Sequence, residues 1–176
     1  MVLTSKFFNR PTCQVAKELL GKFLVRNYKN KLISLMICEV EAYDGPQDLA
    51  CHARVGKTTR TDPMFGSAGH FYVYFVYGVH WMLNIVTGPN GYPSAVLIRG
   101  AGKISGPARL TKFLKINKSL NTKSASKKSG LWIEDRGVII KPESIISTPR
   151  IGVSYAGPYW SKVPYRFVLD SAHIHP

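Results

Sequence analysis

Two carboxylates lie close together in a chain that has few acidic residues. Glu39 and Glu41 stand near the end of the segment 33–43, which begins with apolar residues. Alternate residues of a strand point to one face and lie about 7 Å apart, so each carboxylate could act as a general base or pair with a cation. A salt bridge at a strand end is the other interpretation, and this motif alone leaves both open. The residues expected on one face are Ile33, Leu35, Ile37, Glu39, Glu41 and Tyr43.

Aromatic and imidazole groups follow this strand directly. Tyr43 is succeeded by a turn at 44–46, and His52 stands in the loop beyond it. A carboxylate, a phenol ring and an imidazole together suit a pocket that stacks on a flat heterocycle and hydrogen-bonds to it. We therefore expect Glu41, Tyr43 and His52 to converge on one pocket.

A run of strand-forming aromatic residues spans 70–86 and is broken once, at Tyr77-Gly78. Folded back at this break, the run predicts a β-hairpin with Tyr77 at its tip. An exposed aromatic side chain on a stiff finger suits a wedge pushed between base pairs. The neighbouring rings of Tyr72, Phe75 and Trp81 are interpreted as core or sheet residues, and a backbone contact by His80 stays open.

The charge balance favours a polyanionic partner. Lys and Arg number 24 against 10 acidic residues, which gives a formal net charge of +14. Such an excess accelerates encounter with nucleic acid and releases counterions on binding, although a basic surface kept for solubility is the alternative. A membrane-surface role is disfavoured because no segment has the pattern of a basic amphipathic helix, and no apolar stretch is long enough to span a bilayer.

The cysteines and the N-terminal residues indicate an intracellular protein. Three cysteines without a framework pattern favour free thiols in a reducing compartment, with Cys38 and Cys51 as small apolar fillers. The first residues lack the apolar core of a signal peptide. We expect a cytoplasmic protein, or a nuclear one if the source is eukaryotic.

The elements that position these residues are predicted to form one mixed α/β domain over 1–176, with mainly antiparallel strands. The apolar pattern predicts that Val15, Leu19 and Leu20 line one helix and that Leu110, Phe113 and Leu114 share a face of another. The expected elements are a helix at 11–20, strands at 23–26 and 32–43 around a turn at 27–31, a loop with short helical turns at 44–69, the hairpin at 70–86, a strand at 94–99, a helix at 107–115, a mobile surface loop at 117–130, and short strands and turns from 131.

Collinear motifs along nearly the whole chain resemble the alkyladenine DNA glycosylases, also called methylpurine DNA glycosylases, and are closest to bacterial members. The motifs are 39–46, 50–54, 64–80, 84–89, 95–99, 105–110, 149–153 and 164–167. In one place the chain departs from the family, because only Gly100–Ile104 stands where a longer insertion is usual. The resemblance implies a single domain built on a curved antiparallel sheet, with a protruding β-hairpin and flanking helices.

The resemblance also implies an activity, the excision of damaged purines from DNA by cleavage of the N-glycosidic bond, and roles for particular residues. Glu41 corresponds to the general base that activates water, and Arg99 to the residue that positions this water. The implied base pocket consists of Tyr43 and His52 on the two faces of a flipped base, Tyr74 as a wall and Asn84 as the floor, with Tyr77 as the wedge. Flanking the pocket, the cations expected to contact DNA phosphates are Arg54, Lys57, Arg60 and Arg109.

The expected chemistry is hydrolytic and needs no cofactor or metal. An alkylated purine is already cationic and leaves readily, while Glu41 would deprotonate water and stabilise the oxocarbenium-like sugar. No lysine is identified as a Schiff-base nucleophile, so we expect a monofunctional enzyme without lyase activity, acting as a monomer on duplex DNA. His173 and His175 could hold a metal, but a frayed terminus is the preferred interpretation. The alternative function is a non-catalytic module that binds RNA or distorted DNA.

Overall fold

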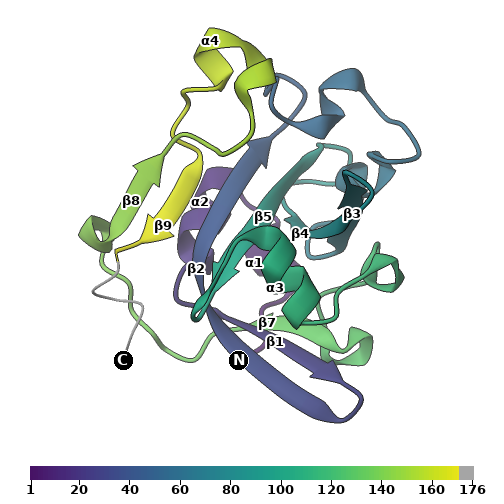
Figure 1. Cartoon of the computed structure of the whole chain (residues 1–176), viewed down its shortest axis with the longest axis vertical. Coiled ribbons are helices and arrows are strands. Elements are labelled where there is room, and N and C mark those ends of the chain that lie inside the picture. Colours follow the sequence, from purple (N-terminus) through teal and green to yellow (C-terminus); the bar gives the residue numbers. More distant parts are fainter. Residues whose placement is uncertain (171–176) are drawn as a thin grey trace.

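Antiparallel strands dominate the computed structural model, which describes residues 1–170 (Figure 1). The helices are α1 Ser5–Phe8, α2 Thr12–Leu19, α3 Pro107–Phe113 and α4 Gly157–Trp160, with 3-10 turns η1 His52–Val55, η2 Asp62–Phe65, η3 Lys118–Leu120, η4 Lys127–Ser129, η5 Pro142–Ser144 and η6 Ser154–Ala156. The strands are β1 Phe23–Tyr28, β2 Lys31–Asp44, β3 Phe71–Val76, β4 His80–Val86, β5 Ser94–Ala101, β6 Ile104–Ser105, β7 Leu131–Glu134, β8 Ile145–Thr148 and β9 Arg166–Leu169.

The strands form one curled antiparallel sheet in which β2 is the longest strand. Its main path runs β3-β4-β5-β2-β1-β7, while β6 pairs with β5 and β9 joins β2 to β8. The first half of β2 pairs with β1, and its second half is flanked by both β5 and β9. This arrangement confirms the predicted fold class of a mixed α/β protein with a curved antiparallel sheet (Figure 1). Within residues 1–170, every helix is too short or too polar to cross a bilayer.

One face of the sheet packs on α2 and forms the main core. Val15 and Leu19 of α2 are fully buried in the same cluster as Val40 of β2 and Ile98 of β5. The predicted helix is confirmed, although it begins at Thr12, directly after Pro11. Proline suits this place because the backbone N–H groups of a first helical turn have no intrahelical acceptor.

The second predicted helix, α3, buries only part of its expected face. Leu110 is fully buried and Leu114, which follows the last helical residue, is buried as well. Phe113 is 50% exposed, so the prediction that it shares the buried face is wrong. The helix contributes one row of side chains to the core, and Phe113 lies beside that row, facing solvent.

The strand that carries the two carboxylates is irregular at one point. Its pairing with β5 shifts register between Ile37 and Glu39 and again between Glu39 and Val40. Ile37 therefore lies in the main core together with Val40, although regular alternation would place these two residues on opposite faces. The prediction that Ile37 shares a face with Glu41 and Tyr43 is wrong for this reason.

The segment expected to be a mobile surface loop at 117–130 is instead hydrogen-bonded along the edge of β3. The Phe71 N–H donates to the Lys123 carbonyl at 2.8 Å, and the Thr122 N–H donates to the Phe71 carbonyl at 2.8 Å. The Asn121 side chain accepts from the Val73 N–H at 2.9 Å. These contacts cover an edge that would otherwise present unpaired donors to solvent.

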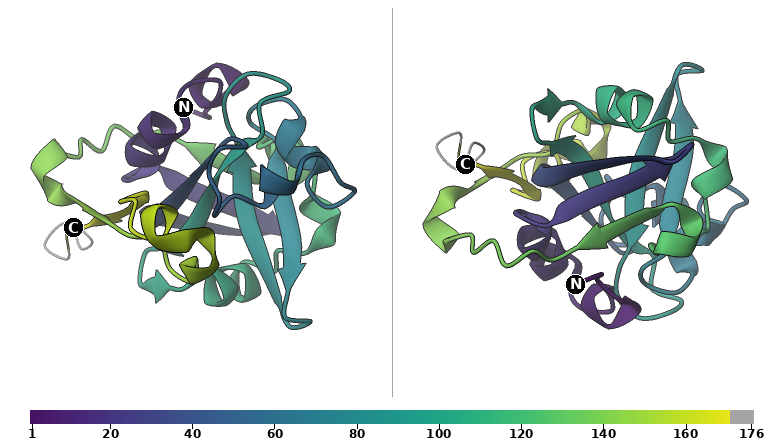
Figure 2. Two further views of the ribbon diagram at one scale, coloured as in Figure 1. Left: turned by 90° about the horizontal axis from the view of Figure 1, so that it is seen from above. Right: turned by 90° about the horizontal axis from the view of Figure 1, so that it is seen from below.

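The β3–β4 hairpin projects from the body of the protein on the side that also carries α3 (Figure 2). Tyr77 is 92% exposed at its tip, as predicted. Both Tyr77 and Gly78 have a positive φ, at 52° and 63°, and the Val79 N–H closes the turn on the Val76 carbonyl at 3.0 Å. A left-handed conformation is uncommon for tyrosine, and such local strain clusters at functional sites.

Candidate active site

A row of register partners crosses four strands on the face opposite the main core. Tyr72 of β3 pairs with Asn84 of β4, Asn84 pairs with Leu97 of β5, and Leu97 pairs with Glu41 of β2. Because paired residues in a sheet point to the same face, the chain brings these side chains together from positions far apart in the sequence.

This face forms the floor of a cavity of about 310 Å³. The volume is in the range of sites that bind small molecules. The predicted residues that line it are Tyr43, His52, Tyr74, Tyr77, Asn84 and Arg99, and other lining residues include Met64, Tyr72, Met82, Leu97, Ile151 and Tyr155. The structure therefore brings six of the predicted site residues together around one cavity.

Glu41 lies directly behind the cavity wall and is fully buried. Its Oε1 accepts a hydrogen bond of 2.8 Å from the backbone N–H of Ile151, and its Oε2 accepts one of 2.8 Å from the Tyr43 hydroxyl. The Arg99 Nη1 atom is 3.5 Å from the same Oε2 atom. All three partner residues line the cavity, so the carboxylate is held between the cavity and the sheet.

Glu39 has a different environment from Glu41. Its Oε1 accepts hydrogen bonds from the Arg99 Nε at 2.9 Å and from the Arg166 Nε at 2.7 Å. Two guanidinium groups on one oxygen make Glu39 an ion-paired residue that fixes the orientation of Arg99. The salt-bridge interpretation of the carboxylate motif therefore describes Glu39 well, whereas the contacts of Glu41 with Tyr43 and Ile151 are hydrogen bonds.

The phenol groups of Tyr43, Tyr72 and Tyr74 remain protonated. Burial, together with the adjacent Glu41 carboxylate, raises the pKa of Tyr43 well above its usual value. Burial likewise raises the pKa of Tyr74, and it raises that of Tyr72 to about 12. Tyr43 is therefore a hydrogen-bond donor to Glu41 at any physiological pH.

His52 is held as a neutral imidazole. Its pKa is lowered to about 4, first by burial and then by the positive charges of Arg60 and Arg54. Its Nδ1 atom is 3.2 Å from the Tyr72 hydroxyl, and its ring centroid is 4.7 Å from that of Tyr74. These contacts fix the ring at the cavity wall.

Asn84 is also fixed by its neighbours. Its side-chain amide donates to the Tyr72 carbonyl at 3.1 Å, and the residue is only 3% exposed. This bond leaves the side-chain oxygen as an acceptor at the cavity floor.

Three of the four cations expected at the phosphates make contacts within the protein. Arg54 donates to the Leu49 carbonyl at 2.7 Å, and the Arg60 guanidinium lies 5.1 Å from the centroid of the Tyr74 ring. Lys57 pairs with Asp62 at 2.9 Å in an exposed ion pair. The fourth, Arg109, belongs to α3, on the side from which the hairpin projects (Figure 2).

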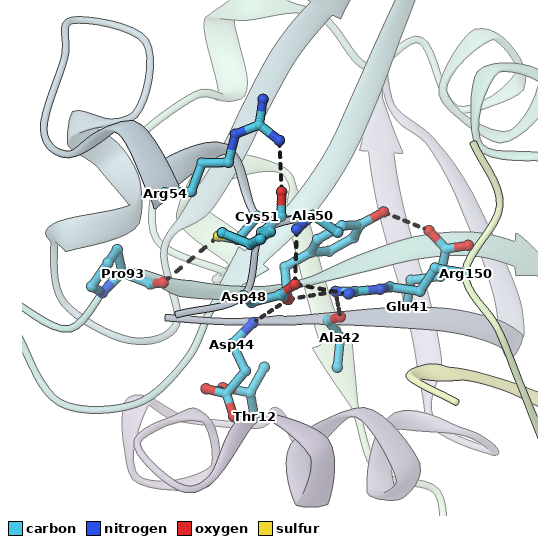
Figure 3. Close-up of polar contacts among 12 residues, drawn as sticks. Thr12, Glu41, Ala42, Asp44, Asp48, Ala50, Cys51, Arg54, Pro93 and Arg150 are labelled. Atoms are coloured by element: carbon cyan, nitrogen blue, oxygen red, sulfur yellow. Dashed lines mark hydrogen bonds and ion pairs between the residues drawn. The ribbon is translucent and has the colours of Figure 1, made fainter. Parts of the chain in front are cut away.

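Sequence patterns did not predict the ion pair that lies under the cavity. Arg150 and Asp48 are both fully buried, and the Arg150 Nη2 donates to Asp48 Oδ1 at 2.8 Å (Figure 3). Arg150 stands in the motif 149–153 that carries the family resemblance, which was the available signal. Its partner is 102 residues away, so no local spacing indicates the pair.

Tyr72 and Tyr155 are further residues of the cavity that were not predicted as site residues. Tyr72 was interpreted as a core or sheet residue; it is 2% exposed but also lines the cavity and contacts His52.

No group of three or more His, Cys, Asp or Glu side chains converges as a metal site within residues 1–170. His173 and His175 lie outside the described residues.

Comparison with known proteins gives a consistent result. The family model described as Methylpurine-DNA glycosylase (MPG) matches residues 6–105 and 101–173. Among similar proteins, one from Methanocella arvoryzae is 42% identical over 176 residues, covering 89% of this chain and 86% of its own. Another from Carboxydothermus hydrogenoformans is 42% identical, and the match covers 97% of this chain and 96% of the relative. One from Legionella pneumophila is 39% identical, and the match covers 98% of this chain and 97% of the relative. All three are named as candidate 3-methyladenine DNA glycosylases.

Proposed function

We propose, from the premise that this chain belongs to the methylpurine-DNA glycosylase family, that it flips damaged purines out of duplex DNA and hydrolyses their N-glycosidic bond. Membership of the family makes the protein a DNA-repair glycosylase, a hydrolase that acts on DNA. One observation supports the specific reaction above all others. A fully buried carboxylate, Glu41, lies behind an aromatic cavity and contacts two groups that line it, Tyr43 and Arg99.

Glu41 is proposed as the general base and Arg99 as the group that positions the attacking water. A water bound to Arg99 from the cavity side would lie close to the Glu41 carboxylate, because Arg99 Nη1 is 3.5 Å from Glu41 Oε2. As the bond to the base breaks, the sugar gains oxocarbenium character, and a nearby carboxylate stabilises that positive charge. The ion-paired Glu39 is proposed to orient Arg99.

The flipped base is proposed to stack between aromatic walls. Tyr43 and His52 would cover its two faces, with Tyr74 beside them and Asn84 at the floor. Stacking of this kind contributes about 1–3 kcal/mol per base and offsets part of the cost of unstacking. Tyr77, exposed at the hairpin tip and also lining the cavity, would fill the gap left in the duplex.

We further propose a monofunctional enzyme that acts as a monomeric single domain over 1–176. No lysine is among the described residues that line the cavity, which supports hydrolysis without a Schiff-base step. Arg54, Lys57, Arg60 and Arg109 are proposed to position the DNA through its phosphates, without reading its sequence.

Release of free base from methylated duplex DNA tests the proposal. Glu41→Gln keeps the shape of the side chain but cannot act as a base, so we expect a loss of at least about 100-fold in the single-turnover rate. The variant should still bind lesion-containing duplex. Glu143→Gln removes an exposed carboxylate and serves as the matched control, with wild-type activity expected.

Two outcomes would contradict the proposal. Wild-type release by Glu41→Gln would refute the assigned base, and a comparison with Glu39→Gln would then show whether that carboxylate acts instead. Absence of base release by the wild-type protein, with lesion DNA still bound, would favour the non-catalytic binding module.

A further inference from the structure

The buried ion pair of Arg150 and Asp48 is hydrogen-bonded to several neighbouring backbone groups. Asp48 accepts hydrogen bonds from the Asp44 N–H at 3.1 Å and the Ala50 N–H at 3.0 Å, so its carboxylate is fully engaged. Arg150 donates from Nη1 to the Ala42 carbonyl at 2.8 Å as well as to Asp48 (Figure 3). Within residues 1–170, the buried Nε atom of Arg150 finds no acceptor.

Such an arrangement is a poor way to gain stability. Removing two charges from water costs several kcal/mol, and apolar residues in the place of a buried ion pair are often at least as stable. A buried donor without an acceptor adds a further cost. Stability therefore does not account for the buried guanidinium group, and the groups that it contacts must be considered instead.

Arg150 contacts the proposed active site in two ways. Its guanidinium carbon is 4.8 Å from the centroid of the Tyr43 ring, a distance typical of cation–π contact. The residue that follows it, Ile151, donates its backbone N–H to Glu41 at 2.8 Å. Tyr43 also donates its hydroxyl to Glu41. The contacts therefore form a closed loop that runs from Arg150 to Tyr43, Glu41 and Ile151 and back to Arg150 along the backbone.

We infer that Arg150, held by Asp48, is a positioning residue of the base pocket. This inference rests on the proposed function, in which Tyr43 stacks on the base and Glu41 activates water. The ion pair fixes the Tyr43 ring through the guanidinium group, and it fixes the Glu41 carboxylate through the adjacent backbone N–H. The Arg150 side chain is fully buried, so it cannot contact a phosphate and acts through its neighbours, among them these two groups.

The decisive variant removes the ion pair without leaving an unpaired buried charge. Arg150→Met combined with Asp48→Asn keeps similar volumes, and the asparagine oxygen can still accept from one of the two loop N–H groups, those of Asp44 and Ala50. We expect this double variant to remain folded, as judged by its thermal unfolding midpoint. Its single-turnover rate of base release should fall between about 10- and 100-fold, because small misplacements of reacting groups have effects of this size.

Affinity for DNA separates positioning from a general structural defect. We expect the double variant to bind undamaged duplex as tightly as the wild-type protein, because the Arg150 side chain has no exposed surface. Its preference for lesion-containing over undamaged duplex should shrink severalfold, because the Tyr43 ring is no longer held. A merely structural role would lower both affinities together.

Arg136 provides a matched control. It pairs with Glu134 at 2.7 Å and its guanidinium carbon lies 4.3 Å from the centroid of the Phe23 ring, but it does not line the cavity. Arg136→Met should leave base release unchanged. Arg150→Lys keeps the charge opposite Asp48 but lacks the planar group, and it should restore part of the rate lost in the double variant.

The outcomes are distinguishable. A folded double variant that releases base within about twofold of the wild-type rate would overturn the positioning role and leave the proposed function intact. If the double variant does not fold, Arg150→Lys decides in its place, because a wild-type rate and wild-type lesion preference in that variant would overturn the inference. A wild-type protein that releases no base would instead contradict the proposed function.

Discussion

Protonation of His52 should destabilise the folded protein by an amount that follows from its environment. Burial and two nearby arginines, Arg60 and Arg54, lower its pKa in the folded state to about 4. The unfolded chain takes up a proton as the pH falls below about 6.5, whereas the folded chain does not do so until about pH 4. The stability that comes from the neutral ring is therefore fully present above about pH 6.5 and is lost as the pH falls toward 4.

The expected size of this loss is about 2 kcal/mol between pH 7.5 and 4.5. Each pH unit between the two pKa values costs about 1.4 kcal/mol, which gives about 2.7 kcal/mol from pH 6.5 to 4.5. Partial exposure of the ring reduces this figure through solvent screening. The pH dependence of folding is thus a direct measure of how strongly the cavity wall disfavours a charge.

Urea unfolding of the wild-type protein and of His52→Gln, at pH 7.5 and at pH 4.5, measures the effect. The glutamine does not titrate, so only the wild-type protein loses this stability as the pH is lowered. The free energy of unfolding of the variant minus that of the wild-type protein should therefore be about 2 kcal/mol larger at pH 4.5 than at pH 7.5. Carboxylates such as Glu134 and Asp135 have lowered pKa values, but they occur in both proteins and cancel in the comparison. A difference between the two proteins that stays constant within about 0.5 kcal/mol would refute the reasoning.

Other expected outcomes concern the hairpin, the basic side chains and the core. Tyr77→Ser should weaken binding to lesion duplex while leaving the thermal midpoint unchanged, whereas Tyr159→Ser, at another exposed tyrosine, should change neither binding nor the midpoint. Equal effects of the two substitutions on binding would contradict the role of Tyr77 as a wedge. Arg109→Gln should reduce the slope of log affinity against log salt concentration by about one, and an unchanged slope would mean that this residue contacts no phosphate. Leu19→Ala should lower the free energy of unfolding by about 2–5 kcal/mol in a denaturant titration, because Leu19 is fully buried against the sheet, and a smaller loss would show that the core collapses around the gap.

Local patterns predicted the elements of this fold and the tip of its hairpin. The run of strand-forming residues with one break at Tyr77-Gly78 was sufficient to place Tyr77 at an exposed turn, because hairpin formation depends on neighbours in the sequence. Alternation also placed Glu39 and Glu41 on one face, and both carboxylates do contact Arg99.

Local patterns failed where the environment of a side chain depends on distant segments. The alternation of side chains along a strand could not reveal the register shift that places Ile37 and Glu41 on different faces of the sheet, because a bulge depends on the pairing of two strands. The pattern of α3 did not distinguish Leu110, which faces the core, from Phe113, which faces solvent. The polar composition of 117–130 suggested a mobile loop, yet its backbone satisfies the edge of β3.

By itself, the sequence determined the order of the elements, the excess of positive charge and, through the motifs, the family. The tertiary structure alone decided which carboxylate pairs with two arginines and which receives hydrogen bonds from Tyr43 and Ile151. It also decided that a buried Arg150 lies beneath Tyr43. The physical reason is that periodicity and turn propensity act over a few residues, whereas burial, ion pairing and pKa values depend on groups that only the folded sheet brings within a few ångströms.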